Sequence, residues 1–204
     1  MDQDIRVRDV RDDDWDDIVA LEAGAYTSLG LSEERSALES KARASPTTCF
    51  VLEVRGRRAG YLLALPYPAL AFPELTRPEE AVFRSPNLHL HDLVVAEDLR
   101  GAGLGKRLLR QLTARARQQQ YEQISLIAVE GSHGFWSANG FAPRPGVVNS
   151  GGYGPGSVYM SLALRAEASS SPVPPSRAQP SQQIESPTPV GGPPSGASAR
   201  DEVG

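Results

Sequence analysis

The 204-residue chain lacks the features that mark secreted, membrane-spanning or nucleic-acid-binding proteins. Its single cysteine, Cys49, excludes a disulfide within the chain. The first residues, Met1 to Asp4, lack the basic and apolar segments of a secretory signal, and no apolar run approaches the ~20 residues that cross a bilayer. The formal net charge of -4 at pH 7 argues against a nucleic-acid partner, because phosphate binding needs a basic field. We therefore expect a reduced, cytoplasmic protein without membrane or nucleic-acid partners.

The amino-acid composition changes near Ala166. Hydrophobic residues make up 40% of the chain, which is enough for one core, whereas residues 166–204 consist mainly of Pro, Ser, Gly, Gln and Ala. Such a segment cannot bury enough apolar surface to offset the entropy of ordering it. We predict a folded domain over residues 1–165 and a disordered tail over residues 166–204. Pro-rich pieces of the tail could dock a partner, although a dispensable tail is the simpler interpretation.

Residue alternation and helical periodicity divide the folded part into strands and helices. The run Asp12, Asp13 and Asp14 precedes a periodic apolar segment, which suits a helix N-terminus and requires no metal ion. The expected strands cover residues 5–8, 48–54, 59–65, 88–95, 124–129 and 158–164, and further helices are expected over 32–44, 104–119 and 135–139. Hairpins come first and a strand–helix–strand unit follows, so we predict an α/β domain with a mixed sheet and no metal site.

A long Pro-rich segment over residues 66–86 separates the early hairpin from the next strand. Loops of this length in compact domains are usually functional or disordered. The apolar residues Phe72, Leu75, Val82 and Phe83 favour an ordered lid or a substrate-binding loop.

The most informative segment is a strand that leads through a glycine-rich turn into a helix, over residues 89–106. The first amide groups of a helix have no internal partners, and glycines let the backbone approach an anion closely. The turn therefore predicts a phosphate or pyrophosphate site. The P-loop pattern fails because Arg107 follows Gly105 and Lys106, and the dinucleotide pattern fails because Lys106 stands where that pattern needs a glycine.

The spacing Arg100-x-x-Gly103-x-Gly105 resembles the pyrophosphate-binding turn of the GNAT superfamily of N-acetyltransferases. The segment from Gly134 to Phe141 resembles the short helix that ends in Gly-Phe in that family, and the order of elements matches from Ile5 to Leu164. The resemblance implies a mostly antiparallel central sheet flanked by helices, and transfer of an acetyl group from acetyl-CoA to an amine. The residues that it implies for acetyl-CoA binding are Leu93, Val94 and Val95 through their backbone, and Arg100, Gly101, Ala102, Gly103, Leu104, Gly105 and Lys106 at the pyrophosphate.

Two histidines precede the turn on the same strand. By strict alternation, His89, His91, Leu93 and Val95 share one face, and Asp92 lies on the other. Histidine, with an ordinary pKa of ~6.5, can remove the proton of an ammonium group near neutral pH. The pattern is similar to the corresponding strand of arylalkylamine (serotonin) N-acetyltransferases, which implies His91 as the base and His89 as a proton relay. The alternative is a pair of buried histidines with local hydrogen bonds; Asp92 and Glu130 are weaker candidates, for orienting a group and for recognising the amine.

One position departs from the family pattern. Trp136 stands where family members often carry a tyrosine that protonates the departing thiolate, and an indole can only donate a hydrogen bond. We expect Trp136 to line the coenzyme A arm, while Tyr153 or Tyr159 could replace the missing acid. The departure leaves two hypotheses. The first is a small-molecule amine acetyltransferase, for which an arylalkylamine or polyamine is the expected acceptor. The second is a catalytically inactive CoA-binding module. A protein N-terminal or lysine acetyltransferase ranks lower, because the loop over residues 66–86 would crowd a peptide. The oligomeric state is left open.

Overall fold

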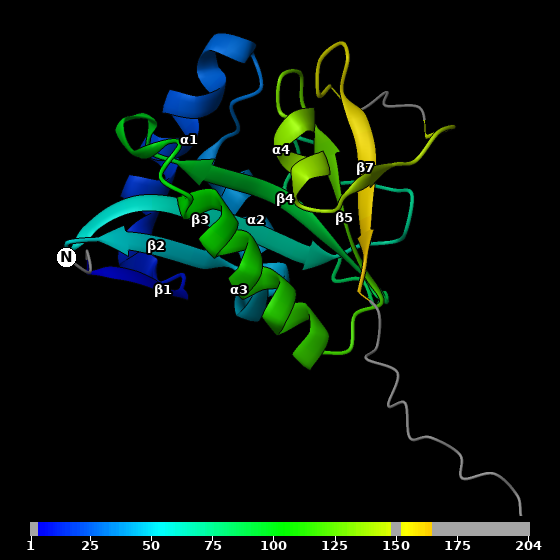
Figure 1. Ribbon diagram of the computed structural model, residues 1–204, viewed down its shortest axis with the longest axis horizontal. Coiled ribbons are helices and arrows are strands. Elements are labelled where there is room, and N and C mark those ends of the chain that lie inside the picture. The colour runs from blue at the N-terminus through cyan, green and yellow to red at the C-terminus, as the bar shows by residue number, and fades with distance from the viewer. Residues whose placement is uncertain (1–3, 148–151, 165–204) are drawn as a thin grey trace, which may run out of the picture. The chain divides into compact units, whose positions relative to one another are not determined.

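The computed structural model describes residues 4–147 and 152–164, which contain a seven-stranded sheet with helices on both faces (Figure 1). The strand order is β1-β2-β3-β4-β5-β7-β6. The predicted tail over residues 166–204 lies outside the described residues. The strands are β1 (Ile5–Asp9), β2 (Phe50–Val54), β3 (Arg57–Pro66), β4 (Asn87–Val95), β5 (Gln123–Ala128), β6 (Ala142–Pro143) and β7 (Val158–Ala163). The helices are α1 (Trp15–Tyr26), α2 (Arg35–Ala44), α3 (Leu104–Gln118) and α4 (His133–Ala138), with short 3-10 turns η1 (Asp12–Asp14), η2 (Thr27–Leu29), η3 (Pro46–Thr48) and η4 (Glu97–Leu99).

All neighbouring strands of this sheet run antiparallel except β4 and β5, which run parallel. Helix α3 makes the crossover between these two strands, as a parallel connection requires. The prediction of a mixed, mostly antiparallel α/β sheet flanked by helices is confirmed.

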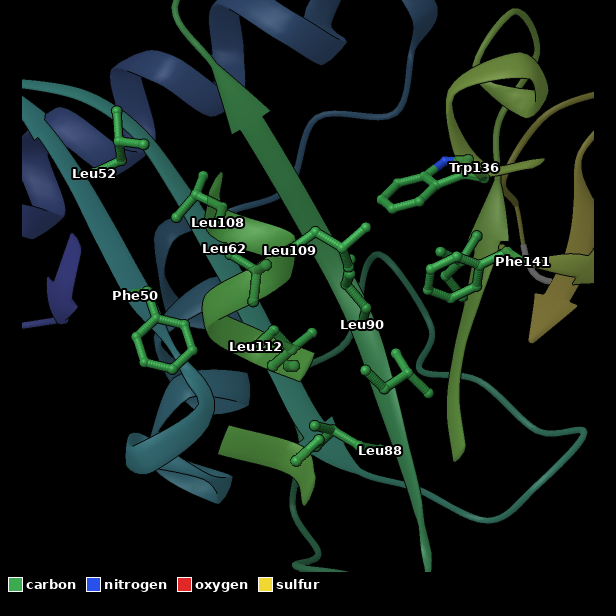
Figure 2. Close-up of a cluster of buried hydrophobic side chains, with 14 of the residues drawn as sticks. Phe50, Leu52, Leu62, Leu88, Leu90, Leu108, Leu109, Leu112, Trp136 and Phe141 are labelled. Atoms are coloured by element: carbon green, nitrogen blue, oxygen red, sulfur yellow. The ribbon is translucent and has the colours of Figure 1, made fainter. Parts of the chain in front are cut away.

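The two faces of the sheet carry separate hydrophobic cores. Helix α3 buries Leu104, Leu108 and Leu112, which lie on one side of the helix at helical spacing, against the inner residues of β2, β3, β4 and β5 (Figure 2). Each such leucine contributes roughly 1.5–3 kcal/mol to folding. On the opposite face, α1 and α2 cover a second cluster that includes Tyr61 and Val94.

The acidic run at the start of α1 is structural. Asp14 is fully buried and accepts two hydrogen bonds from the Arg8 guanidinium at 2.6 and 2.7 Å. Burial alone would raise the pKa of Asp14, but the bonds from Arg8 and the Arg11 backbone outweigh it and lower this pKa to about 2. The interpretation of this run as a helix start is confirmed.

Helix α2 begins at Arg35 rather than at the predicted Ser32. The Ser32 hydroxyl donates to Glu22 Oε2 at 2.6 Å, and the Glu33 backbone N–H donates to Glu22 Oε1 at 2.8 Å. Both residues are therefore held in a loop by a carboxylate of α1, and this tertiary contact overrides the local signal for a helix.

Strand β4 contains a bulge at His91. Leu63 of β3 lies opposite Asp92, while the next residue, Ala64, lies opposite Leu90, so His91 is an extra residue in β4. Beyond this point Leu93 packs toward the α3 core, whereas His91 faces the segment that precedes α2. The expectation that His89, His91, Leu93 and Val95 share one face is therefore wrong, because the bulge reverses the alternation.

Strands β4 and β5 separate soon after they pair. Their register runs only from Asn87 opposite Gln123 to His89 opposite Ser125, although β4 continues to Val95 and β5 to Ala128. Within the described residues, the β5-side edge of β4 therefore has no strand partner beyond His89. The two strands diverge toward the N-terminal end of α3.

Candidate active site

A groove of about 720 Å³ runs along the diverging end of β4 to the first turn of α3. We call it the turn groove. Its wall contains the three β4 residues Leu93, Val94 and Val95, and the turn residues Arg100, Gly101, Gly103, Leu104, Gly105 and Lys106. Of the residues predicted for acetyl-CoA binding in this segment, only Ala102 is outside the wall; its side chain is exposed. The open edge of β4 therefore leads directly to the glycine turn.

The backbone of the turn suits an anion. Gly101 and Gly103 have φ angles of 80° and 79°, in the left-handed region that disfavours side chains. A Cβ atom at Gly103 would meet no heavy atom within 4 Å, so the space beside it is open. Gly103 is also the N-cap of α3, so the first amides of this 15-residue helix face the groove with the positive end of its dipole. These features fit a pyrophosphate group.

A second, smaller cavity of about 100 Å³ opens beside the turn groove. We call it the inner cavity. The two spaces share five wall residues: Tyr26, Leu93, Val129, Ser132 and Trp136. The indole of Trp136 reaches from α4 toward β4, packed edge-on against Phe141 at a centroid distance of 5.5 Å (Figure 2). Trp136 therefore stands where the two spaces meet.

The loop over residues 67–86 helps to close the inner cavity. Leu75 of this loop is part of the cavity wall. The hydroxyl of Tyr153 donates to the Pro73 carbonyl at 2.8 Å, and the Leu70 N–H donates to the Tyr159 hydroxyl at 3.0 Å. These bonds tie the loop to the segment around β7, so the loop is ordered, while its role as a lid or a substrate-binding loop stays a prediction.

His91 faces the inner cavity from the bulge of β4. Its side chain is 1% exposed, and its Nε2 lies 2.5 Å from Glu33 Oε1. The other ring nitrogen, Nδ1, is buried and has no hydrogen-bond partner among the described residues. One side of the imidazole is therefore fixed by a carboxylate, and the nitrogen on the other side is buried without a hydrogen-bond partner among the described residues.

His89 has different surroundings. It is 1% exposed, its Nδ1 lies 3.1 Å from the Ser125 hydroxyl, and its ring lies near Tyr67 and Tyr159. Burial, helped by the charge of His91, holds its pKa well below 6.5. His89 is therefore a neutral ring and is not part of the inner-cavity wall.

Asp92 is a buried carboxylate in the wall of the inner cavity. The Tyr26 hydroxyl donates to its Oδ1 at 2.6 Å, and the Tyr61 hydroxyl donates to its Oδ2. Burial raises the pKa of Asp92 to about 6, although both tyrosine bonds act in the opposite direction. Sequence reasoning gave Asp92 little weight and missed Tyr26; an acid within an apolar strand was the available signal.

Two of the three remaining candidates each line one of the two spaces, and the third lines neither. Tyr153 lines the inner cavity, and burial raises the pKa of its phenol far above the ordinary value. Tyr159 is not part of the wall of either space. Glu130 is exposed and lies along the turn groove rather than the inner cavity. Of the two tyrosines named from the sequence, only Tyr153 therefore lines the inner cavity.

The sequence profile of the acetyltransferase (GNAT) family matches residues 15–141 of the chain. This match covers more than half of the chain, so the protein belongs to the GNAT acetyltransferase family. No curated protein matches it in sequence. The similarity to serotonin N-acetyltransferases therefore stays a prediction.

Solved structures with the same fold include several GNAT proteins. Ard1 from Thermoplasma volcanium is 16% identical, with a TM-score of 0.62 over 79% of this chain and 99% of that one. The GNAT-like decarboxylase GphF, in complex with isobutyryl-CoA, is 22% identical, with a TM-score of 0.63 over 78% and 100%. The PaiA N-acetyltransferase from Thermoplasma acidophilum, in complex with coenzyme A, is 12% identical, with a TM-score of 0.57 over 78% and 98%. At these identities the likeness shows the fold alone.

Among the described residues, none of the helices has the length and apolar character needed to traverse a lipid bilayer.

Proposed function

We propose that the protein transfers an acetyl group from acetyl-CoA to the amine of a small molecule, with His91 as the base. The observation that carries the proposal is the buried, unpartnered Nδ1 of His91, a residue in the wall of the cavity that adjoins the turn groove. An ammonium group must lose a proton before it can attack a carbonyl carbon, and Nδ1 of His91 would accept this proton.

The turn groove is the proposed acetyl-CoA site. The amides of Gly101 to Lys106 would bind the pyrophosphate, and the open edge of β4 at Leu93 to Val95 would bind the pantetheine arm by backbone hydrogen bonds. Bound there, acetyl-CoA supplies the activated acyl group. The groove and the inner cavity share Trp136 and four other wall residues, so the acyl group and His91 would meet where the two spaces adjoin.

The inner cavity favours a small acceptor over a peptide. It is about 100 Å³ in volume, and Leu75 of the loop over residues 67–86 covers part of it. Its charged wall residues include the carboxylates of Glu33 and Asp92, and no arginine or lysine of the described part of the chain lines it. A free amino acid would place its carboxylate beside these two acids without a counter-ion, which is unfavourable in a buried site. We therefore propose an amine without a neighbouring carboxylate, such as an arylalkylamine.

His89 is proposed to assist His91 as a proton relay. Its ring is buried and neutral, and the two histidines flank Leu90 on β4. Position 136 carries a tryptophan, so the usual tyrosine is not there to act as the general acid for the departing thiolate. Tyr26, the one phenol in the wall of both spaces, and Tyr153 of the inner cavity are the candidates.

The test is release of free thiol from acetyl-CoA with arylalkylamines, polyamines and amino acids as acceptors. Release with an arylalkylamine and none with the matching amino acid is the expected result. If no acceptor supports release while calorimetry detects bound coenzyme A, the protein is a CoA-binding module and the proposed activity is wrong. Acetylation of peptides, detected by mass spectrometry, would instead indicate a protein substrate.

A further inference from the structure

Three buried side chains form a linear chain of two contacts, and two of them, His91 and Glu33, belong to the wall of the inner cavity. Glu33 Oε1 lies 2.5 Å from His91 Nε2, and Glu33 Oε2 accepts a hydrogen bond from Lys41 Nζ at 2.5 Å. The side chains of His91, Glu33 and Lys41 are 1%, 4% and 0% exposed. Water therefore has little access to these contacts, and the lysine charge compensates the carboxylate charge.

Helix α1 also holds Glu33 in place, in addition to the contacts with β4 and α2. Glu33 lies between η2 and α2, in the loop that Glu22 of α1 fixes through the Ser32 hydroxyl at 2.6 Å and the Glu33 N–H at 2.8 Å. Glu22 is itself 1% exposed. The position of the Glu33 carboxylate is thus set by α1 and α2 together.

The contact with Glu33 fixes which ring nitrogen of a neutral His91 carries the proton. A carboxylate only accepts hydrogen bonds, so Nε2 must carry the proton and the lone pair resides on Nδ1. Nδ1 is the atom without a partner among the described residues, and His91 lines the inner cavity. The tautomer enforced by Glu33 is therefore the one that leaves the proton acceptor at the unpartnered Nδ1 of a residue in the cavity wall.

We infer that Glu33, neutralised by Lys41, is a positioning residue that holds His91 in the Nε2–H tautomer and stabilises the imidazolium formed when Nδ1 takes a proton. The inference rests on the proposed function, because it assigns His91 as the base. Burial alone would raise the pKa of Glu33, but the charges of His91 and Lys41 outweigh it and lower this pKa. Glu33 is accordingly ionised at neutral pH and is the group that balances the new positive charge on the ring.

Other charged groups act on the same three side chains, so variants that are compared across pH must leave these groups unaltered. They come from α1, β4 and the loop over residues 67–86, and they are Glu22, His89, Asp92 and Glu79.

The test compares the native protein with the double variant Glu33→Gln/Lys41→Met. Glutamine keeps the size of Glu33 but lacks its charge and offers both a donor and an acceptor, and methionine avoids an unpaired buried lysine. Nitrogen NMR of the imidazole should show the Nε2–H tautomer for neutral His91 in the native protein and a mixture of tautomers in the double variant. Detection of the Nδ1–H tautomer in the native protein would overturn the inference, whether or not the protein is an enzyme.

Kinetics provide the second readout. We expect kcat of the double variant to fall about 10- to 100-fold with little change in KM, as for other groups that orient a reacting side chain. The same double change in a His91→Ala background should cause no further loss of kcat, whereas a merely structural role would lower kcat in both backgrounds. Glu39→Gln, which removes a carboxylate from the Arg35 ion pair on α2, is the control and should leave kcat unchanged. An unchanged kcat in the double variant would refute the positioning role, while absence of acyl transfer in the native protein would refute only the proposed function.

Discussion

The substitution Gly103→Val separates the binding role of the glycine turn from its structural role. Gly103 has a φ of 79°, and a Cβ atom there would meet no heavy atom within 4 Å. A side chain would therefore cause backbone strain of about 1–2 kcal/mol without a clash inside the protein. This strain should lower Tm by roughly 2–8 °C, and the fold should survive.

The same side chain would occupy the turn groove where the pyrophosphate is proposed to bind. Loss of two charge-assisted hydrogen bonds to the turn, at about 1.5–3 kcal/mol each, predicts at least ~100-fold weaker binding of coenzyme A. The matched control is Gly56→Val in the β2–β3 hairpin, where φ is also 79° and the space is also open.

Both variants should show a similar fall in Tm by circular dichroism, and only Gly103→Val should lose affinity in calorimetry. If Gly103→Val binds coenzyme A as tightly as the native protein, the pyrophosphate assignment is wrong. If Gly56→Val loses the same affinity, strain rather than occlusion is responsible.

Three further substitutions test other parts of the account. His91→Ala should lower acyl transfer at neutral pH, and the deficit should shrink as pH rises because solvent then deprotonates the amine; a deficit that is constant across pH would exclude a base. Burial raises the pKa of Asp92 from 3.8 to about 6. Because the folded pKa is the higher one, stability should fall as pH rises through this window, by about 3 kcal/mol in total. Urea titrations of Asp92→Asn should not show this loss of stability with rising pH. If the loss persists in the variant, another group causes it. Gly60→Ala would place a Cβ 2.6 Å from the Val94 carbonyl oxygen and should destabilise the sheet by about 1–3 kcal/mol, whereas Gly24→Ala on α1, with open space around it, should be neutral or stabilising in the same thermal melts.

The strand–turn–helix unit at the glycine turn could be predicted because its signals are local. The alternating segment before Val95, the glycines at 101, 103 and 105, and the leucine periodicity of α3 each determine backbone conformation within a few residues. The turn groove follows from these elements, so nearly all of its predicted turn residues lie in its wall.

The surroundings of the histidines could not be predicted in the same way. The bulge at His91 is a property of the register between β3 and β4, and it reverses the alternation on which the face assignment depended. The contact between His91 and Glu33 joins residues 58 positions apart, and the bond from Tyr26 to Asp92 spans 66 positions. Ser32 resembles a helix start in isolation and becomes part of a loop only because Glu22 binds it.

Transfer of the acetyl group from acetyl-CoA to an amine can be followed directly. Acetyl-CoA labelled with ¹³C in the acetyl group would be incubated with an arylalkylamine and either the native protein or His91→Ala, and the products would be identified by mass spectrometry. We expect the native protein to form a labelled N-acetyl amide in an amount equal to the free coenzyme A, and His91→Ala to form much less of it at neutral pH. Release of coenzyme A without a labelled amide, or equal amide formation by both proteins, would contradict this expectation.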